Sequence, residues 1–285
     1  MTQIDVDHLQ SWIGRRRSKR DHLTAFPANA LAATLDRDDP GYASGMPLPP
    51  LWHWLYFLEI FKLQDAGYDG HAALGGFLPP VPLPRRMWAG SRLRWHRPLM
   101  IGAEAEKRSE ILSVKHRRGR SGDLVFVTVQ HDVLSGGQQC LNEEHDIVYR
   151  APAPLDAPVR KPPTAGTGAD FSRKIAPSPV LLFRYSALTF NGHRIHYDTP
   201  FCKGTEGYEG LVVHGPLLAT LMLDALRRHK PGAKLTGFEF RAQAPVFDTE
   251  PFHVEGRLTS TASADLWIRR ADGAEAMRGA ASFTL

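Results

Sequence analysis

Apolar residues gather in two similar patterns, one in each half of the chain. Residues 48–67 read LPPLWHWLYFLEIFKLQDAG, which opens with prolines and is apolar nearly all round until its end. Residues 212–229, VVHGPLLATLMLDALRRH, are equally apolar, and Pro216 suits a first helical turn, where an N–H would have no helical partner. Because a surface helix would show one polar face, each segment predicts a long helix that is buried on most sides.

Strand-like runs follow each predicted helix. In the second half Phe238, Phe240 and Ala242 alternate with charged or amide side chains, the period-2 pattern of a half-buried strand. Turn-forming stretches such as RGRSGD and SGGQQ separate the runs of the first half. The predicted strands cover 91–99, 110–117, 123–133 and 144–150 in the first half, and 236–246, 250–260, 264–271 and 276–285 in the second.

The order of one buried helix followed by antiparallel strands therefore occurs twice. It describes a sheet that curls around a helix, the α+β arrangement called the hotdog fold, and the repeat predicts a double hotdog packed as an internal pseudo-dimer. Residues 151–170 are rich in Pro, Ala and Gly without a hydrophobic period, which is typical of a linker. We expect a hotdog domain over 1–150, a linker over 151–172 and a second hotdog domain over 173–285. The alternative is two unrelated α+β domains.

Composition limits the class of protein. A hydrophobic fraction of 42% and a charged fraction of 23% are those of a globular protein and argue against disorder. No apolar run approaches the roughly eighteen residues of a membrane span, and the N-terminus lacks signal-peptide features, so we expect no membrane partner and a cytoplasmic location. Cys140 and Cys202 form neither a disulfide framework nor a zinc-like spacing, in agreement with a reducing compartment.

The charge of the chain points to anionic partners. Its formal net charge is +5, and arginines cluster in residues 14–20, 84–97 and 115–120. These clusters are explained by solvated faces or by a small phosphorylated ligand. The sequence contains no zinc finger, RNP-type strand or basic-helix repeat, so we do not expect nucleic acid as a partner.

Residues 189–198, TFNGHRIHYD, place Asn191, His193 and His196 close together, and His214 follows at the start of the second predicted helix. The three histidines could supply the nitrogens of a catalytic zinc site. The Asn-Gly pair, however, breaks a helix that would align the first two, and no acidic residue stands at a familiar ligand spacing. We therefore expect no metal. A catalytic base with its orienting partners and a polar turn remain the two explanations.

The run YSALTFNGHRIHYD, followed by LVVHGPLLATLML, resembles the hydratase motif of the MaoC-like enoyl-thioester hydratases. In that family an Asp, an Asn and a His stand at a fixed spacing, which falls here on Asn191, His193 and His196, so only the His is kept. Residues 31–57, 75–99 and 119–133 resemble the N-terminal domain of two-domain dehydratases. That subfamily includes mitochondrial-type 3-hydroxyacyl-thioester dehydratases and bacterial mesaconyl-C4-CoA and itaconyl-CoA hydratases, and TFNGHRIHYD is similar to its usual form of the motif.

The resemblance implies a hydro-lyase that adds water to a 2-enoyl-CoA or acyl-carrier thioester, with one site per chain, in the second half. His196 would be the general base, Asn191 would hold the water, and His193 would donate a hydrogen bond or share the proton transfer. The backbone N–H groups at Gly215, where the helix begins, would stabilise the enolate oxygen. Gly215 could instead be required for close packing alone. No metal or redox cofactor is needed for this chemistry.

The resemblance favours a short, branched dicarboxylyl-CoA substrate such as mesaconyl-C4-CoA or itaconyl-CoA. A 3-hydroxyacyl-thioester dehydratase of fatty-acid metabolism, a thioesterase and a non-catalytic acyl-CoA-binding protein are the alternatives. The sequence leaves open whether the pseudo-dimer pairs again as a homo-oligomer. Candidate cations for the CoA phosphates are Arg85, Arg86, Arg92 and Arg94, and candidates for a distal carboxylate are Arg184, Arg194 and Arg241.

Overall fold

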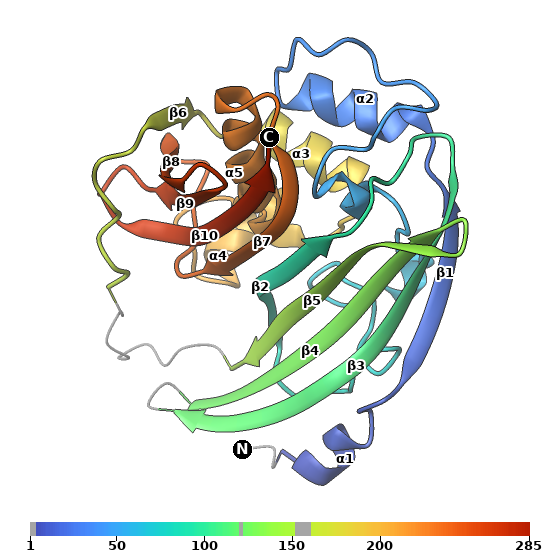
Figure 1. Ribbon diagram of the computed structural model, residues 1–285. Coiled ribbons are helices and arrows are strands. Elements are labelled where there is room, and N and C mark those ends of the chain that lie inside the picture. Colours follow the sequence, from blue (N-terminus) through green and yellow to red (C-terminus); the bar gives the residue numbers. More distant parts are fainter. Residues whose placement is uncertain (1–3, 120–121, 152–160) are drawn as a thin grey trace.

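The computed structural model describes residues 4–119, 122–151 and 161–285. Its strands form one ten-stranded sheet in the order β1-β3-β4-β5-β2-β7-β10-β9-β8-β6 (Figure 1). Every neighbouring pair in this sheet is antiparallel. The strands are β1 (Arg16–His22), β2 (Arg85–Trp95), β3 (Glu104–Gly119), β4 (Gly122–Ser135), β5 (Gln138–Arg150), β6 (Phe171–Ile175), β7 (Lys234–Ala242), β8 (Phe252–Ser260), β9 (Ser263–Arg269) and β10 (Glu275–Thr284).

The strand order of the two halves is the same. The N-terminal half runs β1-β3-β4-β5-β2 and the C-terminal half β6-β8-β9-β10-β7, so each strand has a counterpart five strands later. The halves meet at β2 and β7, where Gly90 lies so close to β7 that a Cβ would overlap the Phe240 carbonyl oxygen. This repeated topology is that of a double hotdog, as predicted. Of the expected linker, residues 152–160 lie outside the described residues.

The central helix of the C-terminal half is α5 (Gly215–His229). It is buried without interruption from Leu217 to Leu226, which confirms the prediction from its all-round apolar sequence. Pro216 occupies the first turn, and Arg227, Arg228 and His229 lie in the last turn, where the negative end of the helix dipole favours cations. No helix among the described residues is long and apolar enough to cross a membrane.

The prediction of a long helix over residues 48–67 is wrong. This segment contains only the short 3-10 helices η1 (Trp52–Leu55) and η2 (Leu63–Asp65). Leu51 and Phe57 both have a positive φ, which ends any helix on either side of η1. The apolar pattern reflects burial alone, because Leu51, Trp52, Leu55, Tyr56 and Phe57 are all buried. Figure 1 shows the chain between α2 (Ala25–Thr34) and β2 as mostly irregular segments, first beside α2 and then, in cyan, behind the N-terminal strands.

Several shorter elements were not predicted. The basic segment 14–20 contributes to the edge strand β1, where alternating charged side chains protect a free sheet edge. The helix α3 begins where the Ser178 side chain accepts a hydrogen bond from the Leu181 N–H. The remaining short helices and the second edge strand are α1 (Val6–Gln10), α2, α3 (Pro179–Leu188), α4 (Thr199–Gly204) and β6.

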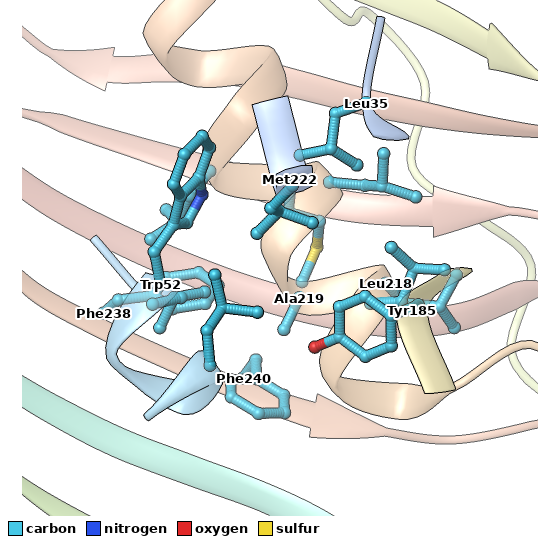
Figure 2. Close-up of a cluster of buried hydrophobic side chains, with 14 of the residues drawn as sticks. Leu35, Trp52, Tyr185, Leu218, Ala219, Met222, Phe238 and Phe240 are labelled. Atoms are coloured by element: carbon cyan, nitrogen blue, oxygen red, sulfur yellow. The ribbon is translucent and has the colours of Figure 1, made fainter. Parts of the chain in front are cut away.

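One hydrophobic core joins the two halves around α5. Trp52 and Leu35 from the N-terminal half pack with Met222 of α5 and with Phe238 of β7 in a single buried cluster (Figure 2). A second, smaller core lies under the N-terminal strands and includes Val125, Val127 and Tyr149. The shared core holds the irregular segment 48–57 of the N-terminal half against α5 of the C-terminal half. A cavity lies beside this contact.

Candidate active site

A cavity of about 970 Å³ lies between the two halves. Its C-terminal side is formed by Asn191, His193, His196 and Gly215. Its N-terminal side is formed by the irregular segment 53–78 and by residues of β2 to β5. The four predicted catalytic residues are therefore brought together at one cavity, although Gly215 comes from a different element than the others.

His196 is held in an orientation that suits a general base. It ends the 3-10 helix η3 (Arg194–His196), is buried, and its Nδ1 lies 2.6 Å from the Val212 carbonyl oxygen. Because a carbonyl oxygen only accepts hydrogen bonds, Nδ1 must carry the proton, and Nε2 keeps its lone pair. The His196 ring also stacks on that of His214, with centroids 3.6 Å apart.

The surroundings keep His196 neutral. Burial, together with the charge of His193, lowers the pKa of His196 to about 3, although its hydrogen bond to Val212 opposes this shift. His214 is buried as well, its pKa is well below the ordinary value because of burial, and its Nε2 lies 2.8 Å from the Ser186 hydroxyl. Both imidazoles are therefore uncharged at neutral pH, and the His196 Nε2 is free to accept a proton.

Asn191 and His193 form the turn before His196. The Asn191 side-chain oxygen accepts a hydrogen bond from the His193 N–H at 3.0 Å, so the turn and the site are built from the same residue. This bond orients the Asn191 amide and leaves its NH2 group without a partner among the described hydrogen bonds. His193 lines the cavity and its ring meets that of His196 edge-on, with centroids 5.5 Å apart. His193 therefore lies in the wall of the cavity beside His196.

The N-terminal half contributes two residues that sequence reasoning missed. Asp69 accepts hydrogen bonds at 3.0 Å from both the backbone N–H and the Nδ1 of His71. The His71 ring lies against that of His193, with centroids 4.0 Å apart. Burial lowers the pKa of His71, and the hydrogen bond with Asp69 opposes this shift. For Asp69, burial acts to raise the pKa, but the contacts with His71 outweigh burial and the pKa is lowered. A carboxylate thus stands beside the motif in which Asn191 replaces the family's Asp.

The loop that carries Asp69 is docked directly onto the catalytic turn. The Arg194 N–H donates to the Asp69 carbonyl oxygen at 2.8 Å, and the Arg194 guanidinium donates to the Tyr68 carbonyl oxygen at 3.0 Å. Gly70 has a φ of +87°, and a Cβ there would overlap the Gly192 carbonyl oxygen. Two glycines are therefore needed where the loops cross, which explains the Gly of the Asn-Gly pair.

Asp69, His71 and His193 form a group among the described residues that could hold a metal ion. Ligand atoms of Asp69, His71 and His193 all lie within 4.8 Å of one another. The combination considered from the sequence was different, because it joined His193 with His196 and His214. His196 and His214 are stacked face to face, and neither belongs to a metal-binding group among the described residues.

Gly215 opens the first turn of α5 toward the cavity. A Cβ built on Gly215 would meet nothing within 4 Å, so close packing does not explain this glycine. The preceding residue, His214, makes no side-chain hydrogen bond to the helix start, and Pro216 has no N–H to offer. The N–H groups of the first turn and the positive end of the helix dipole are therefore directed to a region that a thioester carbonyl can enter.

The predicted arginines have different environments. Arg85 and Arg86 line the cavity, and Arg85 is paired with Glu206 at 2.9 Å. Arg92 is on the outer surface in ion pairs with Glu144 and Asp146. Arg94, the fourth candidate for the CoA phosphates, is exposed and does not line the cavity. The expectation of a buried cation for a distal carboxylate among Arg184, Arg194 and Arg241 is wrong, because Arg194 is bound to Asp198 and the other two are exposed away from the cavity.

A second polar cluster, also missed in the sequence, lines the cavity from the N-terminal half. The buried Glu143 accepts hydrogen bonds from Trp54 Nε1 at 3.1 Å and from the Ser91 hydroxyl at 2.7 Å, and lies 3.2 Å from His53 Nε2. Lys107 lies nearby, and burial lowers its pKa to about 8. Ser91, Lys107 and Glu143 come from the strands β2, β3 and β5, and His53 and Trp54 come from η1, so no linear pattern reveals the cluster.

Comparison with known proteins places this architecture in a family. The family model described as hydroxyacyl-thioester dehydratase type 2 matches residues 51–248. A mesaconyl-C(4)-CoA hydratase of Chloroflexus aurantiacus is 46% identical over 94% of this chain and 95% of its own length. The mitochondrial hydroxyacyl-thioester dehydratase type 2 of Schizosaccharomyces pombe is 30% identical over 88% of this chain and 92% of its own.

Solved structures agree on the fold. A MaoC-like dehydratase from Phytophthora capsici superimposes with a TM-score of 0.70 at 15% identity and covers 98% of this chain and 99% of its own. A Mycobacterium tuberculosis protein described as having a double hotdog fold gives a TM-score of 0.58 at 14% identity, over 95% of this chain and 96% of its own. Family match, relatives and fold agree: the chain belongs to the hydroxyacyl-thioester dehydratase type 2 family and is a hydro-lyase.

Proposed function

We propose that the chain hydrates a short, branched dicarboxylyl-CoA of the mesaconyl-C4 type, and that His196 is the general base. The observation that carries the mechanism is the bond from His196 Nδ1 to the Val212 carbonyl oxygen, which leaves Nε2 as the basic atom at the cavity. The choice of acyl group is supported by the 46% identity to a protein named mesaconyl-C(4)-CoA hydratase.

The reaction proceeds by addition of one water molecule across the double bond. Nε2 of His196 takes a proton from the water, and the oxygen bonds to the β-carbon while the double-bond electrons move toward the thioester. The enolate oxygen that forms is stabilised by N–H groups at the start of α5, beside Gly215. His196 then returns a proton to the α-carbon, and the reverse sequence dehydrates the 3-hydroxy thioester. These steps require no metal or redox cofactor.

Asp69 and His71 act as positioning residues in this proposal. The Asp69 carboxylate accepts from His71 Nδ1, and the His71 ring packs on His193, whose backbone N–H is bound by Asn191. A carboxylate in this position restores the negative charge that the change from Asp to Asn at position 191 removes from the motif. It also orients His71 in one tautomer, so that the polar wall beside His196 is fixed before substrate binds.

A substrate panel tests this proposal against its rivals. Purified protein is incubated with mesaconyl-C4-CoA, itaconyl-CoA, crotonyl-CoA and a long-chain 2-enoyl-CoA, and products are identified by mass. We expect addition of one water, fastest with the dicarboxylyl substrates, and no free thiol. Faster hydration of the long-chain substrate would favour a dehydratase of fatty-acid metabolism, and release of thiol without a hydrated product would establish a thioesterase. A protein that binds these thioesters but converts none would belong to the non-catalytic class.

A further inference from the structure

The N-terminal wall of the cavity carries a cation whose carboxylate partner is missing. Two arginines of this wall are already paired, Arg17 with Glu59 at 3.0 Å and Arg85 with Glu206 at 2.9 Å. Lys107 and Arg150 also line the cavity without an ion pair to a described residue, but neither lines the small inlet beside His193. Glu143 is surrounded by its own donors. Arg86 also lines the cavity and is half-buried, yet it makes no ion pair with any described residue.

Arg86 stands at the border between the two polar clusters. It lies on β2 directly across from Tyr149 of β5, and it lines a small inlet together with Asp69 and His193. Because cross-strand partners share a face of the sheet, the guanidinium is on the side of the sheet that holds the buried Tyr149. Arg86 therefore belongs to the N-terminal half but borders the histidines of the catalytic turn.

The electrostatic effect of Arg86 agrees with this position. Burial is the main cause of the low pKa of His71 and of His193, and the Arg86 charge lowers both further. Burial is also the main cause of the low pKa of His145, and the charges of Lys107 and then Arg86 lower it further. These imidazoles stay neutral beside Arg86, so the local field is positive and favours the binding of an anion.

A second polar atom nearby also lacks a partner. His145 lines the cavity, and its Nε2 is buried without a hydrogen-bond partner among the described residues. His145 and Tyr149 are four residues apart on β5, so their side chains lie on the same face, the face that Arg86 shares. A guanidinium without an ion pair and an imidazole nitrogen without a hydrogen-bond partner, both counted among the described residues, share one wall of the cavity and can together bind a carboxylate.

We propose that Arg86 binds the free carboxylate of a dicarboxylyl thioester and thereby sets the preference of the enzyme for such substrates over simple acyl thioesters. The inference rests on the proposed function. In a mesaconyl-C4 thioester, the free carboxylate is bonded to the β-carbon, which also receives the water. The carboxylate must therefore bind beside the catalytic histidines, where Arg86 stands, and not at the far end of the cavity. Arg86 was one of four arginines assigned from the sequence to the CoA phosphates, and in this proposal it binds the carboxylate of the acyl group instead.

The test compares two substrates that differ only at this carboxylate. In 3-methylcrotonyl-CoA a methyl group replaces the carboxylate of mesaconyl-C4-CoA, while the thioester and the double bond are the same. The ratio of kcat/KM for the two substrates is measured for wild type, Arg86→Leu, Arg86→Lys and the control Arg108→Leu, whose guanidinium is exposed and paired with Glu106. The melting temperature of each variant shows whether it is folded.

We expect Arg86→Leu to lower the ratio on the order of 10- to 100-fold, because a charge-assisted bidentate contact is lost. Arg86→Lys recovers part of the ratio, and Arg108→Leu leaves it at the wild-type value. An equal loss for both substrates would overturn the inference and return Arg86 to the CoA phosphates. Wild type that hydrates 3-methylcrotonyl-CoA or crotonyl-CoA but not mesaconyl-C4-CoA would instead refute the proposed substrate, and that result is read before any variant is compared. If Arg86→Leu does not fold, the ratio for Arg86→Lys decides.

Discussion

The two halves of the molecule have the same strand order but different contents at the cavity. The C-terminal half keeps a central helix of fifteen residues, α5, and carries His196 at the end of the 3-10 helix η3. The N-terminal half replaces the helix with irregular chain and short 3-10 turns, and it supplies Asp69, His71 and a polar inner wall. One copy of a duplicated fold can thus carry the reactive group, while the other copy, which has no central helix, forms the opposite wall of the same cavity.

The largest expected effect comes from removing the ion pairs that join the two halves. Asp224 on α5 is bound by Arg37 of the N-terminal half and by Arg173 and Arg228 of its own half. Asp224→Ala leaves three guanidinium groups around an empty position, and we expect a loss of about 3–5 kcal/mol in the free energy of unfolding. Denaturant titration measures this loss. Asp265→Ala serves as the control, because Asp265 makes two more exposed ion pairs, with Arg257 and Arg278, and we expect a loss below about 1 kcal/mol. Equal losses for both variants would contradict the structural role of Asp224.

The loop of the N-terminal half that carries Asp69 should contribute to catalysis. Asp69→Asn keeps the shape of the side chain but removes the charge that orients His71, and we expect kcat to fall on the order of 10- to 100-fold. The control is Asp65→Asn on the same segment, which is exposed. A loss of kcat with unchanged melting temperature and an altered pH profile identifies a positioning residue. Full activity of Asp69→Asn would show that the C-terminal half works without the loop.

The pH dependence of stability sharpens the comparison further, because both halves bury neutral histidines. The pKa is about 3 for His196 and about 4 for His145, below the ordinary value near 6.5. The unfolded chain therefore binds more protons at acidic pH, so the stabilisation is complete above about pH 6.5 and is lost as the pH falls toward about 4 for His145 and about 3 for His196. Each histidine contributes a slope of up to about 1.4 kcal/mol per pH unit in the free energy of unfolding. His196→Gln and His145→Gln should each reduce the slope, whereas the exposed His8→Gln should not.

The smallest expected effect concerns metal. Dialysis against a chelator should leave activity unchanged, since the proposed mechanism routes every proton through His196. Added Zn²⁺ should inhibit, because Asp69, His71 and His193 offer ligand atoms within 4.8 Å of one another. Loss of activity on chelation, with recovery on adding one metal equivalent, would instead assign a catalytic ion to this group.

Sequence patterns predicted the parts of the molecule in which local pattern and tertiary role agree. Alternation along the strands and the all-round apolar sequence of α5 were sufficient for the fold, and the spacing of the motif was sufficient to bring Asn191, His193 and His196 to one turn. The segment 48–67 was misread because burial produces the same apolar pattern with or without a helix, and the positive φ of Leu51 and Phe57 is not visible in composition.

The missed half of the site has a different cause. Asp69 and His71 lie in GYDGH, an ordinary turn sequence, and only the crossing of Gly70 over Gly192 brings them to the catalytic turn. Likewise, the partners of Glu143 come from other segments of the chain, so the polar wall is a property of strand register rather than of any one strand. Arg86 was predicted as a candidate ligand, but the sequence does not show that it lies beside His193, or that it differs from Arg85 and Arg92 in having no ion pair with a described residue.

The most direct test of the account is the rate at which His196→Ala consumes mesaconyl-C4-CoA, followed by the ultraviolet absorbance of the conjugated enoyl thioester. His229→Ala, at the far end of α5, is the matched control. The account predicts that wild type and the control hydrate the thioester, while kcat of His196→Ala falls by roughly 10²- to 10⁴-fold with its melting temperature preserved. A folded His196→Ala variant that is as fast as wild type would contradict the assignment of the base and, with it, the division of roles between the two halves.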